Sequence, residues 1–248
     1  MIGFTRIERG NMVILARSDC AERVADAMSD SQLCRPSGKG GRGDLLRFDC
    51  AGGTGLIRRY QRGGALRHVV KDAYVFINRP LREFVLHRHL LATGLDVPPL
   101  LGVCWSRSGL IYRGAIATVE IDGEDLLAHL QKNPDDRQTL QACGRLIRHM
   151  HDLRLWHGDL QLKNILVGSS GLLLIDFDKA RLLPRLTPQQ CARNLFRLRR
   201  SFEKHRFPLE YFEDVCAGYG VLAVSAWVDR LYEVKGRCSD WAARRPRR

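Results

Sequence analysis

Two acidic residues and one amide at fixed spacing constrain this chain more than any other feature of its sequence. Asp159 and Asn164 lie five residues apart in the stretch 157–166, and Asp176 follows the apolar run 172–175. Phosphoryl transfer requires a carboxylate that orients the attacking hydroxyl, and an amide and a second carboxylate that hold Mg²⁺. Asp159 is therefore the candidate catalytic residue, and Asn164 and Asp176 are the candidate metal ligands. The alternative is a polar turn between two strands whose acids carry no chemistry.

Length and composition set the outer limits of the fold. The 248 residues, 45% of them hydrophobic, suffice for one large domain or two lobes with a sizeable core. No apolar run approaches the roughly 18 residues of a membrane-spanning helix, and the stretch 12–16 is too short for a signal peptide. We therefore expect the protein to stay in the cytoplasm. The eight cysteines form no CxxC pair, which argues against a zinc module and favours reduced thiols.

The net charge of +13 is carried mostly by arginine. Nucleic acid, anionic phosphate substrates and an acidic membrane surface would all suit this surplus, and its sign does not select among them. No zinc finger, helix-turn-helix or stacked-aromatic motif accompanies the charge, so no nucleic-acid partner is expected. Basic side chains gather in the segment 193–206 and the tail 244–248, either as solvated surface or as contacts for anionic lipid.

The first part of the chain has the pattern of short strands and turns. A hairpin is expected between 45–48 and 56–60, across a turn at 52–55. One helix is expected over 78–91, with Asn78 as its cap and a proline in its first turn.

The second part has a helical pattern. Apolar residues at spacings of three and four predict a buried helix over 140–150, which leads to the stretch around Asp159. Together the patterns predict an α+β fold of two lobes. The N-terminal lobe (1–118) is β-rich, with a glycine loop and one helix, and the C-terminal lobe (119–248) is mainly helical with a basic tail.

Several motifs resemble those of the protein-kinase-like superfamily and, more narrowly, of the bacterial lipopolysaccharide kinases that act on 3-deoxy-D-manno-octulosonic acid (Kdo). They are a glycine loop at 41–43, an arginine strand with a Gly-Gly turn at 57–64 and an Arg-Glu-Phe helix start at 82–84. Two more follow, an Asp-Phe-Asp-Lys segment at 176–179 and an arginine-rich helix at 194–201. The resemblance runs from about residue 38 to about residue 204 and so covers most of the chain.

The resemblance implies a bilobal protein-kinase-like fold that uses ATP and Mg²⁺. It implies transfer of the γ-phosphoryl group to a hydroxyl, the 4-OH, of Kdo on a lipid A precursor. It also implies a peripheral location at the anionic surface on the cytoplasmic side of the bacterial inner membrane. The nucleotide-binding residues that it suggests are Gly41, Arg42, Gly43, Arg58, Glu83 and Lys163.

The match departs from ordinary protein kinases on the strand after the glycine loop. Arginine stands where those enzymes carry lysine, at Arg58 or at Arg59, and its planar fork needs different room around a phosphate. The metal strand reads Asp-Phe-Asp instead of Asp-Phe-Gly, and no Ala-Pro-Glu follows, so a docked peptide substrate is not expected. Lys163 lies either near the γ-phosphate or in solvent, and His157 is expected to be structural.

Three alternatives stay open on the sequence alone. One is another kinase of the same fold that acts on a heptose, an antibiotic or a protein. The second is a basic nucleic-acid-binding module, suggested by the net charge. The third is a catalytically dead pseudokinase, which the arginine at position 58 keeps open.

Overall fold

The structure is a computed structural model, and it describes residues 3–38, 45–50, 53–60, 74–75, 78–109 and 111–220. The chain divides into two compact units. The first comprises Met1–Ala92 and Val97–Ile121, and the second comprises Thr93–Asp96 and Asp122–Arg248. The sequence-based boundary between residues 118 and 119 separates the expected N-terminal lobe from the expected C-terminal lobe, and it stays a prediction.

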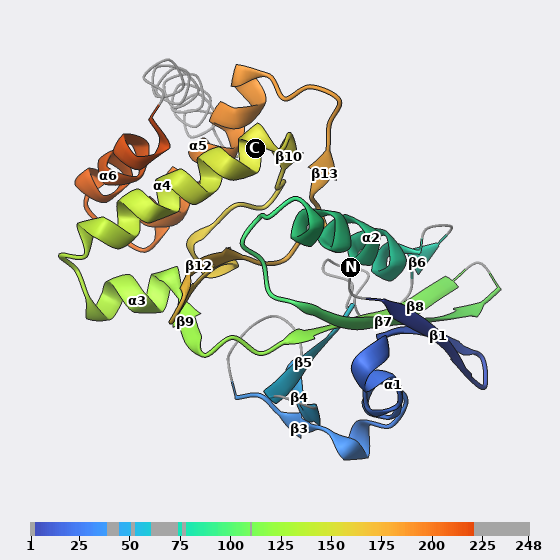
Figure 1. Cartoon of the computed structure of the whole chain (residues 1–248). Helices are drawn as coiled ribbons and strands as arrows, with labels where there is room; N and C mark the ends of the chain where they lie inside the picture. Colours follow the sequence, from blue (N-terminus) through green and yellow to red (C-terminus); the bar gives the residue numbers. More distant parts are fainter. Residues whose placement is uncertain are drawn as a thin grey trace, which may run out of the picture. The chain divides into compact units, whose positions relative to one another are not determined.

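Within the described residues, the first unit contains one eight-stranded antiparallel sheet. Its order is β1-β2-β7-β8-β5-β4-β3, with β6 paired to β8 (Figure 1). The strands are β1 (Phe4–Arg9), β2 (Met12–Arg17), β3 (Arg35–Pro36), β4 (Leu45–Cys50), β5 (Gly53–Arg59), β6 (Tyr74–Val75), β7 (Leu100–Ser108) and β8 (Ile111–Val119).

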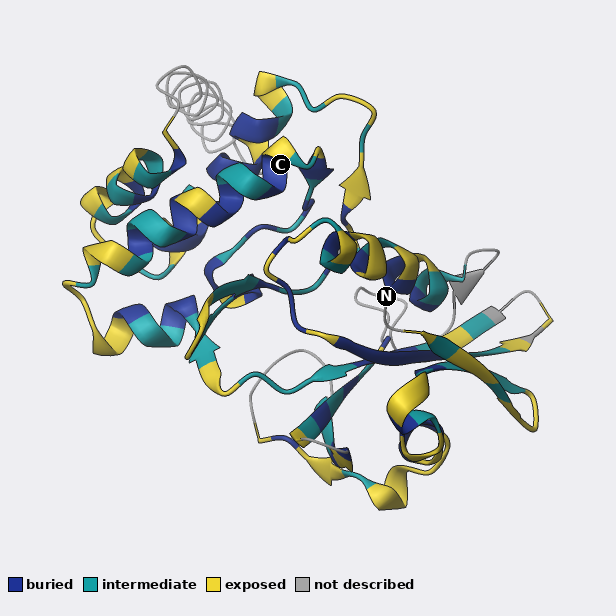
Figure 2. Cartoon of the chain, viewed as in Figure 1, coloured by how far each residue is buried: buried dark blue, intermediate teal, exposed yellow. Residues whose placement is uncertain are grey.

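Helices α1 (Ala21–Ser29) and α2 (Arg79–Ala92) cover opposite faces of this sheet (Figure 1). The α1 face is a continuous core in which Val24 packs with Phe48 and Ile57. On the other face, Phe84 of α2 packs against Val103 and other buried side chains. Strand β7 lies between these two cores, so much of it is buried (Figure 2).

The expected helix over 78–91 is confirmed as α2. Asn78 caps it, because its side-chain oxygen accepts a 3.1 Å hydrogen bond from the backbone N–H of Leu81. Gly94 follows the helix with a φ of +79°, in the left-handed region that glycine adopts without strain. The cap and the glycine both carry signals that can be read from sequence.

Two expectations for the first unit are wrong. The sequence pattern predicts one helix there, but α1 is a second one, and its N-cap Cys20 makes no side-chain capping bond that would mark its start. The expected turn at 52–55 is too long, because strand β5 already begins at Gly53. Gly55 is a packing glycine within that strand, since a Cβ there would lie 2.3 Å from the Phe48 ring.

The second unit is mainly helical in its described part. Its helices are α3 (Leu126–Lys132), α4 (Arg137–Asp152), α5 (Pro188–Lys204) and α6 (Leu209–Tyr219). Strands β9 (Gly123–Asp125), β11 (Ile165–Gly168) and β12 (Gly171–Leu174) form a small sheet, and β10 (Leu155–Trp156) pairs with β13 (Arg181–Leu182).

Helix α4 is the expected buried helix, and it leads directly into the stretch around Asp159. Asp136 caps it by accepting a 3.0 Å hydrogen bond from the backbone N–H of Thr139. Helices α4 and α6 meet backbone to backbone at two glycines. A Cβ on Gly144 would lie 2.1 Å from the Val215 carbonyl oxygen, and one on Gly218 would lie 2.0 Å from that of Gln141.

A buried polar chain also joins three of these helices. Asn194 of α5 donates a 3.1 Å hydrogen bond to Nε2 of His151, whose Nδ1 lies 2.8 Å from the hydroxyl of Tyr219. Burial lowers the pKa of His151 to about 4. The network therefore depends on a neutral imidazole.

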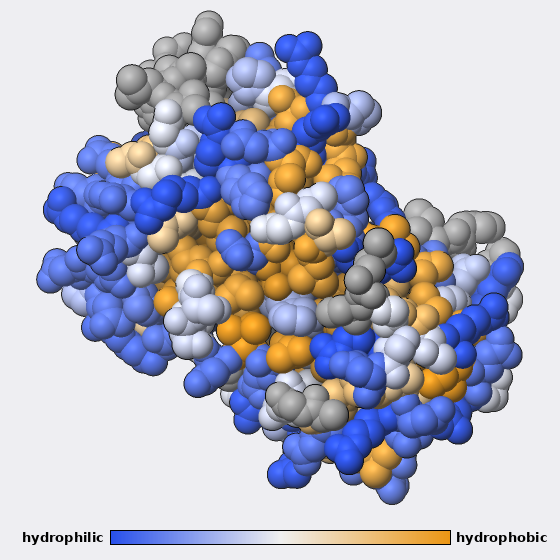
Figure 3. Space-filling view, in the orientation of Figure 1, coloured by the Kyte–Doolittle hydropathy of each residue, from blue (hydrophilic) through white to orange (hydrophobic). Residues whose placement is uncertain are grey.

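Within the described part of the chain, no helix is long and apolar enough to cross a membrane. Hydrophilic side chains cover the outer side of the second unit, on the left in Figure 3. Its helices thus turn their apolar faces inward and their polar faces to solvent.

Candidate active site

His157 fixes the backbone around the candidate catalytic residue. Its side chain is fully buried, its Nε2 lies 3.0 Å from the carbonyl oxygen of Ile175, and its Nδ1 accepts a 3.4 Å hydrogen bond from the Asp159 N–H. One neutral tautomer satisfies both bonds, with the proton on Nε2. Burial lowers the pKa of His157, which favours that neutral form. The structural role expected for His157 is confirmed.

Asn164 is tied to the same loop through its side chain. The residue is buried, and its Nδ2 donates a 2.8 Å hydrogen bond to the backbone carbonyl of Asp159. A carbonyl can only accept, so this bond fixes which end of the amide is the nitrogen. The Oδ1 atom is thereby oriented as an acceptor, as a metal ligand at this position requires.

Asp176 returns to this loop by way of the β11–β12 hairpin. The residue before it, Ile175, donates its backbone N–H to the Asn164 carbonyl at 3.1 Å. Asp176 itself has a φ of +67°, a left-handed conformation that costs a non-glycine residue roughly 1–2 kcal/mol. Strain of this kind persists where the surroundings hold a residue in place, and it is common at functional sites.

Two cations flank the carboxylate of Asp159. Lys179 Nζ lies 2.9 Å from Oδ2, and Arg197 Nη1 lies 3.8 Å from Oδ1. The three groups come from the loop around Asp159, from the turn after Asp176 and from helix α5. Sequence reasoning placed both cations inside family motifs, and Arg197 also in the basic segment considered for lipid contact. It gave neither a role beside Asp159, because their proximity to Asp159 depends on how distant segments pack.

Lys163 is exposed in a short 3₁₀ turn, Leu162–Asn164, between Asp159 and β11. The pKa of His205 is lowered by three effects, which are, in order of size, its burial, the charge of Lys204 and the charge of Lys163. Lys163 therefore lies near the end of α5, and its expected role in nucleotide binding stays a prediction.

The first unit carries the other expected nucleotide-binding residues. Arg58 Nη2 forms a 2.5 Å ion pair with Oε1 of Glu83, and the hydroxyl of Tyr60 donates to Oε2 of the same carboxylate at 2.5 Å. Glu83 is buried, and Arg58 is 31% exposed. The pair joins strand β5 to helix α2. Phosphate binding by Arg58 is a prediction, as is the choice of Arg58 over its exposed neighbour Arg59.

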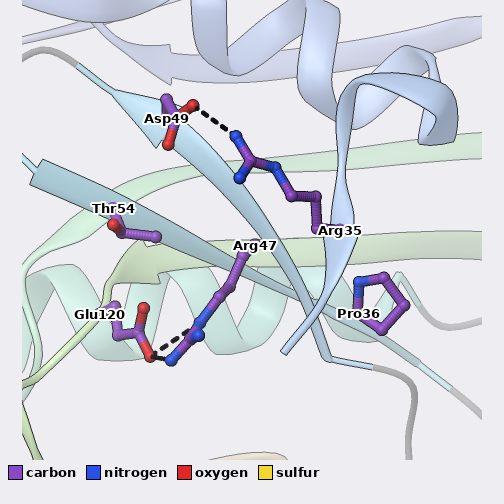
Figure 4. Close-up of a pocket in the computed structure, with 6 residues that line it drawn as sticks. All are labelled: Arg35, Pro36, Arg47, Asp49, Thr54 and Glu120. Atoms are coloured by element: carbon purple, nitrogen blue, oxygen red, sulfur yellow. Dashed lines mark hydrogen bonds and ion pairs between the residues drawn. The ribbon is translucent and has the colours of Figure 1, made fainter. Parts of the chain in front are cut away.

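A pocket of about 430 Å³ opens on the first unit (Figure 4). Arg47 projects into it from β4 and forms an ion pair with Glu120, which follows β8. Arg47 pairs in register with Leu56, two residues before Arg58 on β5, so all three side chains lie on one face of the sheet. The remaining lining residues are Arg35, Pro36, Asp49 and Thr54.

The expected glycine loop, Gly41, Arg42 and Gly43, lies outside the described residues. It connects strand β3 to strand β4, which pair with each other at the edge of the sheet. Its proposed contact with nucleotide phosphates stays a prediction.

The oxygen donors present fit Mg²⁺. Asn164 Oδ1 and the Asp176 carboxylate are hard oxygen ligands, which Mg²⁺ prefers, and two protein ligands suffice where phosphates and water complete the shell. In the described residues no group of three His, Cys, Asp or Glu side chains gathers at metal-binding distance. A role for Asn164 and Asp176 as metal ligands stays a prediction.

Comparison with known proteins decides the family. The model of the lipopolysaccharide kinase (Kdo/WaaP) family matches residues 36–219. The chain belongs to this family. Membership makes it an ATP-dependent sugar kinase and confirms the resemblance stated from the motifs. The matched segment contains the Asp159 loop, Asp176, and the Arg58–Glu83 pair.

Similar curated proteins carry one name, 3-deoxy-D-manno-octulosonic acid kinase. The Xylella fastidiosa protein is 35% identical over 180 residues, which is 71% of this chain and 72% of that protein. The Vibrio cholerae protein is 33% identical over 70% of this chain and 80% of its own length. The Xanthomonas oryzae protein is 37% identical over 74% of this chain and 78% of its own.

The fold also matches a solved structure described as WaaP in complex with acyl carrier protein. The TM-score is 0.55 at 17% sequence identity, over 80% of this chain and 88% of that one. The likeness concerns the fold alone, and it confirms the expected α+β protein-kinase-like fold.

Proposed function

We propose that this kinase transfers the γ-phosphoryl group of ATP to a hydroxyl, the 4-OH, of a Kdo residue on a lipid A precursor. The support from comparison is the shared family and the 33–37% identity to proteins named as Kdo kinases. One observation carries the proposal. Asp159, Asn164 and the strand end before Asp176 are joined by hydrogen bonds into one rigid loop cluster.

In this proposal each residue of the cluster has one role. Asp159 orients the acceptor hydroxyl and accepts its proton as the new phosphate ester forms. His157 and Asn164 position Asp159 through its backbone. Because these supports are buried hydrogen bonds, the carboxylate does not need to find its position during the reaction.

Asn164 and Asp176 hold Mg²⁺ through their oxygens in the same proposal. When bound, the ion supplies positive charge against the phosphate oxygens. On the first unit, Arg58 binds phosphate oxygens through its guanidinium fork, and Glu83 and Tyr60 hold that fork in place. Gly41, Arg42, Gly43 and Lys163 remain further candidates for phosphate contact.

We also propose that the protein works as a peripheral protein at the cytoplasmic side of the inner membrane. The acceptor is anchored in lipid, and exposed cations follow helix α5 towards its C-terminal end. These include Arg200, Lys204 and Arg206. Each basic residue near an anionic surface contributes about 1 kcal/mol of attraction.

The direct test is transfer of labelled γ-phosphate from ATP to a Kdo–lipid A precursor in the presence of Mg²⁺. Control acceptors are a heptose, a peptide and an aminoglycoside, which represent the other kinases considered. We expect label in the Kdo acceptor only, and its position on the sugar follows from NMR of the product. Transfer to the heptose alone would replace the proposed substrate, and no transfer at all would favour a pseudokinase.

A further inference from the structure

A cation lies beside each oxygen of the Asp159 carboxylate, which is itself 30% exposed. Lys179 contacts Oδ2 at 2.9 Å and Arg197 approaches Oδ1 at 3.8 Å, while their side chains are 62% and 50% exposed. A base must accept a hydroxyl proton through one of these oxygens. The Lys179 ion pair at Oδ2 and the nearby charge of Arg197 at Oδ1 therefore compete with the acceptor for Asp159.

The two cations are nevertheless held beside Asp159 by their backbones. Gly158 has a φ of +75°, and a Cβ there would lie 2.6 Å from the carbonyl oxygen of Lys179, so the two backbone segments touch. The backbone of Lys179 therefore lies next to the loop around Asp159, whichever way its side chain points.

Arg197 is anchored on its own element in a comparable way. Ser201 of α5 accepts a 3.2 Å hydrogen bond from the backbone N–H of Leu162, which docks the helix on the catalytic loop. Arg197 lies one turn earlier on the same face of α5, because residues four apart in a helix are neighbours. Its neighbour Leu198 is fully buried, so the helix is packed in place, while the arginine side chain itself is half exposed.

Two anchored, exposed cations beside a base form a site for an anion on the acceptor. The proposed acceptor is itself an acid, since an octulosonic acid carries a carboxyl group at carbon 1 of the sugar that bears the 4-OH. Charge-assisted hydrogen bonds from a lysine and an arginine suit a carboxylate. A neutral sugar would leave both cations on Asp159.

We propose that Lys179 and Arg197 are the specificity residues that bind the acceptor's carboxylate, and that this binding withdraws them from Asp159. The inference rests on the proposed function, because it takes a sugar acid as the acceptor. In the resting site the cations cover the base. An acidic acceptor draws them onto its own carboxylate and frees an Asp159 oxygen for the hydroxyl that reacts.

The test compares a soluble Kdo glycoside with its carboxyl methyl ester, in the wild type and in Lys179→Gln, Arg197→Gln and Lys179→Arg. For the wild type we expect kcat/KM to be about 10- to 100-fold higher for the acid, the range of one or two charge-assisted hydrogen bonds. Lys179→Gln and Arg197→Gln should raise KM for the acid about tenfold. Their kcat/KM for the ester should be unchanged or higher, because Asp159 is then less covered. Lys179→Arg should recover most of the preference for the acid.

Arg181→Gln is the matched control, because it removes an exposed cation two residues beyond Lys179. Thermal unfolding of every variant separates loss of folding from loss of recognition. Equal losses on acid and ester, or equal wild-type kcat/KM for the two acceptors, would overturn this inference alone. No transfer by the wild type to either glycoside or to the Kdo–lipid A precursor would overturn the proposed function and the inference with it.

Discussion

The side chain of Asn164 donates to the backbone carbonyl of Asp159 over 2.8 Å. Through this bond the residue expected to bind metal also supports the residue expected to accept the proton. A substitution of Asn164 can therefore also disturb Asp159 through its backbone. Substitutions at either position should be compared with variants that leave this bond intact.

Asp159→Asn should lower kcat by about 10²- to 10⁴-fold, the usual contribution of a positioned base. Nucleotide affinity should change little, because the amide keeps the shape of the side chain. Steady-state kinetics and a nucleotide-binding titration measure the two effects. Asp152→Asn, at an exposed carboxylate that ends α4, is the control. Activity of Asp159→Asn within a few-fold of the wild type would remove this residue from its catalytic role.

Asp176→Ala and Asp176→Gly should both abolish Mg²⁺-dependent nucleotide binding, since neither can hold the ion. Their stabilities should differ, because only glycine relieves the left-handed backbone at φ +67°. We expect the glycine variant to be the more stable one, with a free energy of unfolding about 1 kcal/mol higher than that of the alanine variant. Denaturant titration measures this difference, and unchanged Mg·ATP affinity in both variants would contradict the metal assignment.

Asn164→Ala should weaken nucleotide binding less than the Asp176 variants and raise the Mg²⁺ concentration needed for activity. The amide supplies one neutral oxygen to the ion, whereas Asp176 supplies a charged group. A Mg²⁺ titration of the reaction rate measures the shift. A rate curve that superimposes on the wild type would show that Asn164 acts only as a support for Asp159.

Arg58→Lys should impair the enzyme although lysine is the common residue in this position of kinases, because the two heads differ in shape and reach. Arg58→Ala should raise KM for ATP further and also destabilise the fold by about 1–3 kcal/mol, since Glu83 would lose a charged partner in a buried site. Arg59→Gln, an exposed neighbour on β5, is the control. A larger loss in Arg59→Gln than in Arg58→Ala would move the nucleotide contact to Arg59.

Acid should destabilise the protein between about pH 6.5 and pH 4. Burial lowers the pKa of His87 to about 4, whereas an unfolded histidine titrates near 6.5. The unfolded state then binds more protons across this window, so stability present at neutral pH is lost as the pH falls. The expected loss from His87 is about 3 kcal/mol. His87→Gln should make the unfolding free energy depend less steeply on pH, leaving the part contributed by His151 and His157, and an unchanged slope would contradict this explanation. His89→Gln, at an exposed site on the same helix, is the control.

Salt should release the protein from anionic vesicles, and neutral vesicles should bind it poorly. The attraction decays over a Debye length of about 8 Å at physiological salt. Replacing Arg200, Lys204 and Arg206 with Gln should weaken co-sedimentation while sparing turnover of a soluble acceptor. Arg199 is left in place, because it pairs with Glu203 and its side chain is only 14% exposed. Binding that ignores both salt and lipid charge would contradict this electrostatic model.

Sequence patterns predicted the elements that carry local signals. Helices α2 and α4 have caps and apolar spacings that can be read directly. Helix α1 has no side-chain cap and went unrecognised. Local signals therefore succeeded where the residues that stabilise an element are close to it in sequence.

The candidate site was predictable only in part for the same reason. The spacing of Asp159 and Asn164 is local and gave the loop. The support of Glu83 by Tyr60, and the approach of Lys179 and Arg197 to Asp159, join segments that are distant in sequence. Contacts of this kind follow from packing, which a single sequence does not specify residue by residue.

The backbone contact between α4 and α6 sets a limit for protein engineering. Because Gly144 and Gly218 each touch the opposite helix, a library of substitutions at either position should yield few folded clones. A shortened catalytic unit would have to retain the chain through Gly220, where α6 ends. Fluorescent or affinity fusions at the C-terminus should therefore be joined beyond that residue, so that α6, which packs against α4, is left whole.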